Sequence, residues 1–136
     1  MTTPERRKYP RVSIYDPISY LCIDGTGAVL AQDMGVARDI SQNGIRIETL
    51  RGIDTKAIQL AFVDIDKEMV EIKGEVVYCR ENQRARFSVG IRLCGQHEEN
   101  VDFVKKLIKF YHVQKDRPRV VVSDSVQPQA ASGQSL

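Results

Sequence analysis

Hydrophobic and polar positions alternate along most of the chain between residues 12 and 93. A period of two is typical of β-strands that bury one face. In segment 45–48, two isoleucines alternate with Arg46 and Glu48. Three later segments repeat the pattern, with apolar positions at Ile58, Leu60 and Phe62, at Val70, Ile72, Val76 and Tyr78, and at Phe87, Val89, Ile91 and Leu93. These segments predict four half-buried strands.

The N-terminal part of this region is less regular. Residues 12–23 are apolar and rich in β-formers, but Asp16 and Pro17 interrupt them. Because proline cannot donate to a strand ladder, we expect a bulge or an edge there. The sequence Asp-Gly-Thr-Gly at 24–27 is a turn signal, which predicts a hairpin with a short strand at 28–31. A separate short strand is predicted at 36–39.

The period changes after Gly95. Apolar residues then recur at helical spacing, with lysines on the other side. The acidic residues lie near the start of this segment and the lysines near its end, as the helix dipole favours. We therefore expect one amphipathic helix over residues 96–113.

The predicted order is six short antiparallel strands followed by one helix. Such strands bury their inner faces best by closing into a small barrel, which also removes the sheet edges. Gly74 predicts the place where the sheet curls. We predict a mainly β fold, a six-stranded antiparallel β-barrel whose C-terminal helix covers one end. A flexible basic arm at 1–11 would precede the barrel and helix at 12–113, and a disordered tail at 114–136 would follow.

Composition narrows the function without identifying it. The chain has 136 residues, which suits one domain, and a net charge of only +2. That charge is too small to indicate general binding to DNA or membrane surfaces. No apolar run reaches the roughly 18 residues of a membrane span, and Met1 is not followed by a signal peptide. We therefore expect a cytoplasmic protein with no membrane insertion.

Residues with catalytic or metal-binding chemistry are few and scattered. Cys22, Cys79 and Cys94 are too far apart in sequence to form a metal-binding pair. His97 and His112 lie at opposite ends of the predicted helix, and no cysteine has a histidine nearby. We expect no metal, no cofactor and no enzymatic activity.

The strongest local charge is the segment 5–11, Glu-Arg-Arg-Lys-Tyr-Pro-Arg. Pro10 favours extended geometry at Tyr9, so this segment is an arm and not a helix. A guanidinium presents a planar fork of donors that fits a phosphate or the O6/N7 edge of guanine. Arg7 and Arg11 can thus converge on one small anionic ligand. The alternative is a solvated basic terminus that binds nothing.

A second group of polar residues lies between two predicted strands. Asp39, Ser41 and Gly44 form the pattern Asp-x-Ser-x-x-Gly. An aspartate can accept hydrogen bonds from the N1–H and N2–H₂ edge of a guanine, and a serine hydroxyl can donate or accept beside it. Glycine lets the backbone turn and leaves room for a flat ring. The alternative is an ordinary tight turn, which uses the same residue types.

The two patterns together resemble the PilZ domain family, which pairs an Arg-x-x-x-Arg arm with a later Asp-x-Ser-x-x-Gly loop. Weaker agreement comes from Gly-Glu-Val-Val-Tyr at 74–78 and Val-Gly-Ile-Arg-Leu at 89–93. The resemblance covers residues 5–112. It implies a PilZ-like split barrel that acts as a receptor for the bacterial second messenger cyclic di-GMP, with the loop on the outer surface and the arm folded over the ligand.

The resemblance also implies roles for the residues that carry it. Arg7 and Arg11 would take guanine edges and phosphates. Asp39 and Ser41 would take the edge of the second guanine, with Gly44 shaping the turn.

Two further residues enter through the resemblance. In the family, an arginine just before the first motif arginine accompanies a stacked pair of ligands, and here that residue is Arg6. Two ligands carry four negative charges, which suits the four cations of the arm. Tyr78 stands where relatives often have an aromatic residue, usually tryptophan, near a guanine. It is either a stacking residue or a core or rim residue.

The implied output is an ordered arm and ligand offered to an unidentified protein effector, in the family a motility, pilus or polysaccharide component. Two alternatives stay open: a PilZ-like adaptor that binds no nucleotide, and a small RNA-binding β-barrel. RNA-binding barrels usually interleave aromatic and cationic residues on one sheet face. Here the outward residues mix both signs of charge, so we expect no nucleic-acid partner.

Overall fold

The computed structural model describes residues 11–41 and 43–116, which form six strands and one helix. The strands are β1 (Val12–Ile23), β2 (Val29–Ile40), β3 (Gly44–Thr49), β4 (Ala57–Val63), β5 (Met69–Glu81) and β6 (Phe87–Leu93). The helix is α1 (His97–Asp116). The strands close into a barrel in the order β1-β2-β3-β6-β5-β4, and every neighbouring pair is antiparallel. This confirms the predicted fold.

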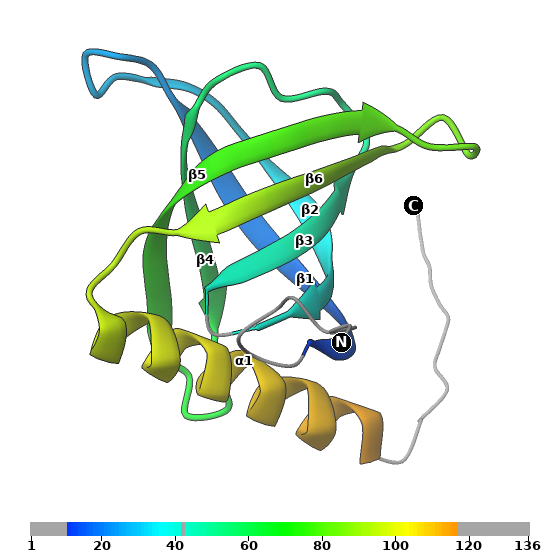
Figure 1. Cartoon of the computed structure of the whole chain (residues 1–136). Helices are drawn as coiled ribbons and strands as arrows, with labels where there is room; N and C mark the ends of the chain where they lie inside the picture. Colours follow the sequence, from blue (N-terminus) through cyan, green and yellow to red (C-terminus); the bar gives the residue numbers. More distant parts are fainter. Residues whose placement is uncertain (1–10, 42, 117–136) are drawn as a thin grey trace, which may run out of the picture.

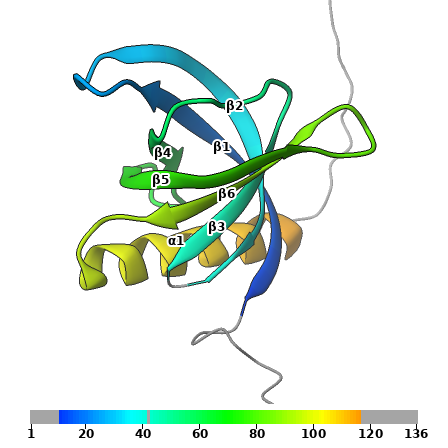
Figure 2. The same ribbon diagram turned by 45° about the horizontal axis from the view of Figure 1, so that its top comes forward.

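Helix α1 lies across one end of the barrel, below the strands in Figure 1. The β1–β2 hairpin extends beyond the opposite end, and the β5–β6 hairpin also projects outward (Figures 1 and 2). The start of β1, the end of β2 and the start of β3 lie at the end that α1 covers (Figure 1). Arg11, Asp39 and Gly44 are therefore brought to one end of the molecule by the strands that carry them.

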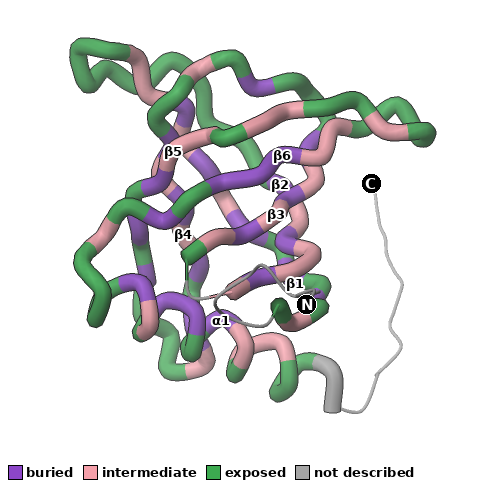
Figure 3. The backbone as a smooth tube through the Cα atoms, viewed as in Figure 1, coloured by how far each residue is buried: buried purple, intermediate pink, exposed green. Residues whose placement is uncertain are grey.

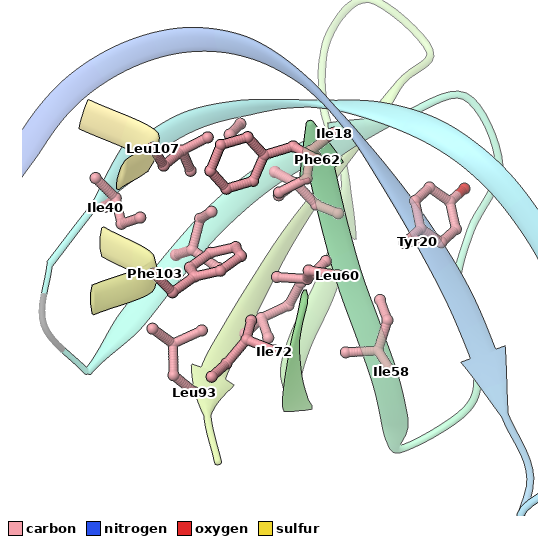
Figure 4. Close-up of a cluster of buried hydrophobic side chains, with 14 of the residues drawn as sticks. Ile18, Tyr20, Ile40, Ile58, Leu60, Phe62, Ile72, Leu93, Phe103 and Leu107 are labelled. Atoms are coloured by element: carbon pink, nitrogen blue, oxygen red, sulfur yellow. The ribbon is translucent and has the colours of Figure 1, made fainter. Parts of the chain in front are cut away.

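The core fills the barrel and continues under the helix. Alternate residues of β3 and β4 are buried, as the period of two predicts (Figure 3). From α1, Phe103 and Leu107 point into the barrel mouth beside Ile40 and Phe62 (Figure 4). The rings of Phe62 and Phe103 pack edge to face, with centroids 5.4 Å apart. The helix thus closes the end of the barrel with its apolar face.

Strand β1 contains the irregularity that Pro17 predicts. The pairing of β1 with β2 shifts register between Ser13 and Asp16, which is the signature of a β-bulge. The side chain of Asp16 is fully buried, and neither of its carboxylate oxygens has a hydrogen-bond partner among the described residues. Burial raises the pKa of Asp16 to about 7, because an ionised carboxylate loses its hydration there.

Strand β2 differs from the prediction. The two short strands expected at 28–31 and 36–39 are parts of one strand of 12 residues. Its first half, Val29–Met34, is exposed and shows no alternation of burial. This half lies in the hairpin that extends past the barrel, and pairing with β3 begins only at Val36. The alternating pattern is absent because no core lies behind this half of the strand.

Helix α1 begins close to its predicted position and ends later. The backbone N–H of Gln96 donates to Glu99, and that of Gly95 donates to Asn100, so side chains satisfy donors at the helix start. The helix continues to Asp116, three residues past the predicted end at 113 and into the predicted tail. Over the described ranges, no helix is long and apolar enough to cross a membrane.

Candidate functional site

The site is built around Asp39, near the end of β2. Strand β2 shifts register against β3 between Ala37 and Asp39, so Arg38 is an extra residue in the ladder. Ala37 and Ile40 are buried, whereas Arg38 and Asp39 are both half-buried. The bulge therefore turns two consecutive charged side chains toward the outside of the barrel.

The carboxylate of Asp39 binds two guanidinium groups, one on each oxygen. Nη1 of Arg11 lies 2.6 Å from Oδ1, and Nε of Arg46 lies 2.8 Å from Oδ2. The Asp39 side chain keeps 20% of its exposure, and each arginine keeps 33%. Because charge-assisted bonds to a partly desolvated carboxylate are strong and directional, the two arginines fix the orientation of Asp39. They also leave the cluster accessible from solvent.

The hairpin between β2 and β3 explains why Arg46 faces Asp39. The backbone N–H of Ser41 donates to the carbonyl of Gly44 over 2.8 Å, which closes the loop. Counting outward from this pair in an antiparallel ladder, Ile40 faces Ile45 and Asp39 faces Arg46. The Oγ atom of Ser41 lies 3.5 Å from the same carbonyl, at the limit of a hydrogen bond.

Gly44 is placed where a side chain would crowd the site. A Cβ atom at this position would lie 3.2 Å from the carbonyl oxygen of Ile91 and 3.8 Å from Nη2 of Arg11. Glycine thus allows the loop to sit against β6 and keeps the surface open beside the Arg11 guanidinium. The N–H of Leu93 donates to the carbonyl of Asn43, which anchors the loop to β6.

A row of residues runs across the outer surface through this cluster. Ser13 faces Asp39, Asp39 faces Arg46, Arg46 faces Gly90, and Gly90 faces Tyr78. A Cβ atom on Gly90 would overlap the ring of Tyr78, so the ring lies over the bare backbone of Gly90. The guanidinium of Arg80 stacks on this ring, 4.6 Å from its centroid. Tyr78 therefore belongs to the same surface as Asp39.

The sequence pattern predicted Tyr78 on the same face of its strand as Val70, Ile72 and Val76, and this prediction was wrong. The pairing of β5 with β6 shifts register between Val76 and Tyr78. After this bulge the alternation is reversed, so that Cys79 packs against the core and Tyr78 lies outside. Tyr78 is therefore not a core residue, and both a stacking residue and a rim residue remain as predictions for it.

More arginines surround the row, and several are already paired. Arg38 bonds Glu48 over 3.0 Å and lies over the ring of Tyr15. Arg46 also reaches Oγ of Ser88, 3.3 Å away. Arg92 forms an ion pair with Glu75. Guanidinium groups thus surround the row on the outer surface of β2, β3, β6 and β5. Within the row, Tyr78 is the aromatic residue and Asp39 is the acidic hydrogen-bond acceptor.

The structure brings together Arg11, Asp39, Gly44 and, at the loop, Ser41, and it places Tyr78 in the same row. Arg6 and Arg7 lie outside the described residues. Arg46 is a site residue that the sequence analysis missed, since it was assigned only to the exposed face of a strand. In the described part of the chain, no three His, Cys, Asp or Glu side chains lie together as a metal site would require.

The PilZ domain model matches residues 5–110 of the chain. The chain belongs to the PilZ domain family. This confirms the resemblance on which the two motifs were interpreted. The comparison with curated proteins gave no match.

Solved structures of PilZ proteins share the fold. The Bacillus subtilis inhibitor of motility, MotI/DgrA, has 12% identity and a TM-score of 0.55, over 83% of this chain and 54% of that one. The Escherichia coli YcgR PilZ domain with c-di-GMP has 10% identity and a TM-score of 0.53, over 86% of this chain and all of that one. The MrkH–c-di-GMP complex of K. pneumonia has 14% identity and a TM-score of 0.55, over 85% of this chain and 56% of that one. The chain thus spans about half the length of MotI and MrkH.

Proposed function

We propose that this PilZ protein is a receptor for cyclic di-GMP, which binds on the outer surface around Asp39. The observation that supports this most directly is the ion pair between Arg11 and Asp39, which joins the last residue of the arm motif to the first residue of the loop motif. A solvated basic terminus would give no reason for this contact. The YcgR PilZ domain and MrkH have both been solved with c-di-GMP, which supports the same assignment here.

Asp39 is suited to recognise a guanine edge. Its two carboxylate oxygens can accept from the N1–H and N2–H₂ groups of the base, as they now accept from Arg11 and Arg46. Binding would exchange at least one of these guanidinium donors for the base. We expect Arg11 to be released, because it enters from the N-terminal arm, and to turn its fork to a phosphate or to the O6/N7 edge of guanine.

Arg46 would act as a positioning residue. It comes from β3 within the barrel, directly opposite Asp39, and it also bonds Ser88. It would hold the Asp39 carboxylate in place while the ligand replaces Arg11. Ser41 and Gly44 would keep the loop closed and leave space for the flat base.

The stoichiometry that we propose is two stacked ligands. Arg6 precedes the first motif arginine, and two molecules of cyclic di-GMP bring four negative charges to an arm with four cations. The arginine-rich surface next to Asp39 adds cations that can face the second ligand. Tyr78, whose half-buried ring lies on this surface against Arg80, would stack on a guanine.

The proposed output is a new surface made of the arm and the ligand, which a protein effector would recognise. Ordering of the arm would be coupled to binding, because Arg11 would exchange Asp39 for the nucleotide and the arm would be held across the ligand. We place this receptor in the cytoplasm and assign it no catalytic step. The process that it regulates, whether motility, pilus function or polysaccharide synthesis, depends on that effector.

Titration calorimetry of wild type and Asp39→Asn tests the proposal. The asparagine amide keeps the size of the side chain but replaces one acceptor oxygen by a donor, so it cannot accept both guanine donors. We expect at least a tenfold loss of affinity for cyclic di-GMP. Lys106→Ala is the matched control, because it removes a surface cation that pairs with Asp102 within α1 and takes part in none of the ion pairs of Asp39. Equal affinities of Asp39→Asn and wild type would refute the assignment of Asp39.

If cyclic di-GMP gives no heat with wild type, the two remaining functions separate in a second measurement. Salt-sensitive binding of single-stranded RNA would favour an RNA-binding barrel. If the chain binds neither cyclic di-GMP nor RNA, the result would favour a PilZ adaptor that binds no nucleotide.

A further inference from the structure

Besides Tyr78 and Arg80, the outer surface carries a second tyrosine in contact with an arginine. The guanidinium of Arg38 lies over the ring of Tyr15, 5.1 Å from its centroid. Tyr15 is 60% exposed, and Arg38 directly precedes Asp39 in β2. An exposed aromatic ring with a cation beside it is a surface on which a nucleobase can stack. This pair therefore extends the chemistry of the candidate site along β1 and β2.

Two β-bulges meet at Arg38. The register of β1 against β2 shifts between Ser13 and Asp16, so two residues of β1 lie opposite this one arginine. These two residues are Ile14, which is buried, and Tyr15, which is exposed. The register of β2 against β3 shifts at Arg38 as well. Because bulges redirect side chains and are frequent next to functional sites, the two irregularities bring this cation and this ring together on the outside of the barrel.

Glu48 holds Arg38 in position. Nη1 of Arg38 donates to Oε1 of Glu48 over 3.0 Å. Nδ2 of Asn82 lies 3.5 Å from Oε2 of the same carboxylate, at the limit of a hydrogen bond. The bond to Glu48 uses one donor of a guanidinium that has several, so the remaining N–H groups can bind a phosphate or the O6/N7 edge of a guanine. The arginine is thus oriented before a ligand arrives.

The ring of Tyr15 lies on the side of Asp39 that Arg11 does not occupy. Arg11 reaches Asp39 on the side of the β2–β3 loop, where its Nη2 would lie 3.8 Å from a Cβ atom on Gly44. Ser13 faces Asp39, and Tyr15 is two residues farther along β1, away from that loop. Two residues of a strand span about 7 Å, so the ring is within reach of a molecule stacked on a ligand at Asp39.

We propose that Tyr15 and Arg38 form the subsite for the second molecule of cyclic di-GMP. The first molecule replaces Arg11 at Asp39, on the side of the loop. The second molecule lies farther along β1, with one guanine stacked on the Tyr15 ring and a phosphate bound by Arg38. This subsite rests on the proposed function, because it needs a first ligand at Asp39.

Titration calorimetry with cyclic di-GMP separates the two molecules. Tyr15→Ala should weaken binding of the second molecule at least tenfold and leave the affinity for the first within twofold of wild type. Tyr15→Phe keeps the ring and should bind both molecules as wild type does. Arg38→Gln removes the cation and should also weaken the second molecule at least tenfold. Met69→Ala is the matched control, because it truncates a side chain of similar exposure, 62%, at the start of β5.

The outcomes distinguish this subsite from the receptor itself. Wild-type affinity for the second molecule in Tyr15→Ala or in Arg38→Gln would overturn the subsite and leave the receptor. A wild-type chain that binds one molecule would do the same. Loss of both molecules in Tyr15→Ala, with the circular dichroism of the barrel unchanged, would assign the ring to the first ligand and also overturn it. If Tyr15→Ala does not fold, Arg38→Gln gives the same test. A wild-type chain that binds no cyclic di-GMP would contradict the proposed function and the subsite together.

Discussion

The Nη1 atom of Arg11 lies 2.6 Å from Oδ1 of Asp39, although the two residues are 28 positions apart in the chain. Arg11 stands just before β1, and Asp39 is near the end of β2, so the antiparallel pairing of β1 with β2 brings them to one edge of the surface. This contact joins the last residue of the arm motif to the first residue of the loop motif.

Replacement of Arg11 should separate binding from stability. Arg11→Ala removes the contact with Asp39, but both side chains are partly exposed, so the free energy of unfolding should fall by no more than about 1 kcal/mol. Affinity for cyclic di-GMP should fall at least tenfold, because one of the two arm arginines is lost. Urea unfolding followed by circular dichroism gives the first quantity and calorimetry the second. Wild-type affinity in this variant would contradict the role of Arg11.

Tyr78 should contribute through its ring and not through its hydroxyl. Stacking of an aromatic side chain on a base is worth about 1–3 kcal/mol, so Tyr78→Ala should weaken binding of cyclic di-GMP by roughly 10- to 100-fold. Tyr78→Phe keeps the ring and should bind like wild type. Equilibrium dialysis of the three proteins compares them. Loss of binding in both variants would assign the effect to the hydroxyl, and loss in neither would remove Tyr78 from the site.

Asp16 should make the fold less stable as the pH rises. Its pKa is raised to about 7 in the folded chain, whereas in the unfolded chain it is close to 3.9. At pH 3 both states are protonated. Between about pH 4 and 7 only the unfolded state releases the proton, so stability falls by up to a few kcal/mol and then levels off.

Asp16→Asn should remove this dependence. The variant should be more stable than wild type at pH 7.5, and the difference between them should shrink toward pH 4. Urea unfolding between pH 4 and pH 7.5 measures this stability difference. Asp54→Asn, at an exposed position, is the control. A difference between wild type and Asp16→Asn that does not vary with pH would show that Asp16 ionises normally.

Gly74 is required by packing. A Cβ atom there would lie 2.5 Å from Cγ2 of Ile91 and 3.2 Å from the carbonyl oxygen of Arg92. Gly74→Ala should therefore lower the free energy of unfolding by about 1–3 kcal/mol through overpacking. Gly25→Ala is the matched control, since nothing lies within 4 Å of its Cβ position in the exposed turn. Equal unfolding midpoints for the two variants would show that β5 and β6 can move apart without cost.

The barrel was predictable because the apolar residues that alternate along its strands mark the face that points into the core. Alternation over 45–48, 58–62 and 87–93 marks strands whose one side meets the core, and the change of period after Gly95 marks α1. The first half of β2 was not recognised as part of a long strand, because it lies outside the barrel and has no buried side to mark. Alternation of apolar and polar residues cannot reveal a strand that buries neither face.

In the candidate site, the described motif residues were predictable from the sequence, whereas the residues that the strands contribute were less so. Tyr78 was assigned to the inner face because a single bulge after Val76 reverses the alternation, and the residue types around it do not signal that bulge. Arg46 could have been found. A tight hairpin that pairs Ser41 with Gly44 sets position 46 opposite position 39, so a cation there faces the motif aspartate.

Titration calorimetry of the full chain with cyclic di-GMP tests the central claim most directly. We predict saturable binding with two molecules per chain, and its loss in the Arg11→Ala and Asp39→Asn variants, while the far-ultraviolet circular dichroism stays that of the wild-type barrel. One molecule per chain would remove the stacked pair and the role of Arg6 but leave the receptor. A folded wild-type chain that binds no cyclic di-GMP would contradict the claim.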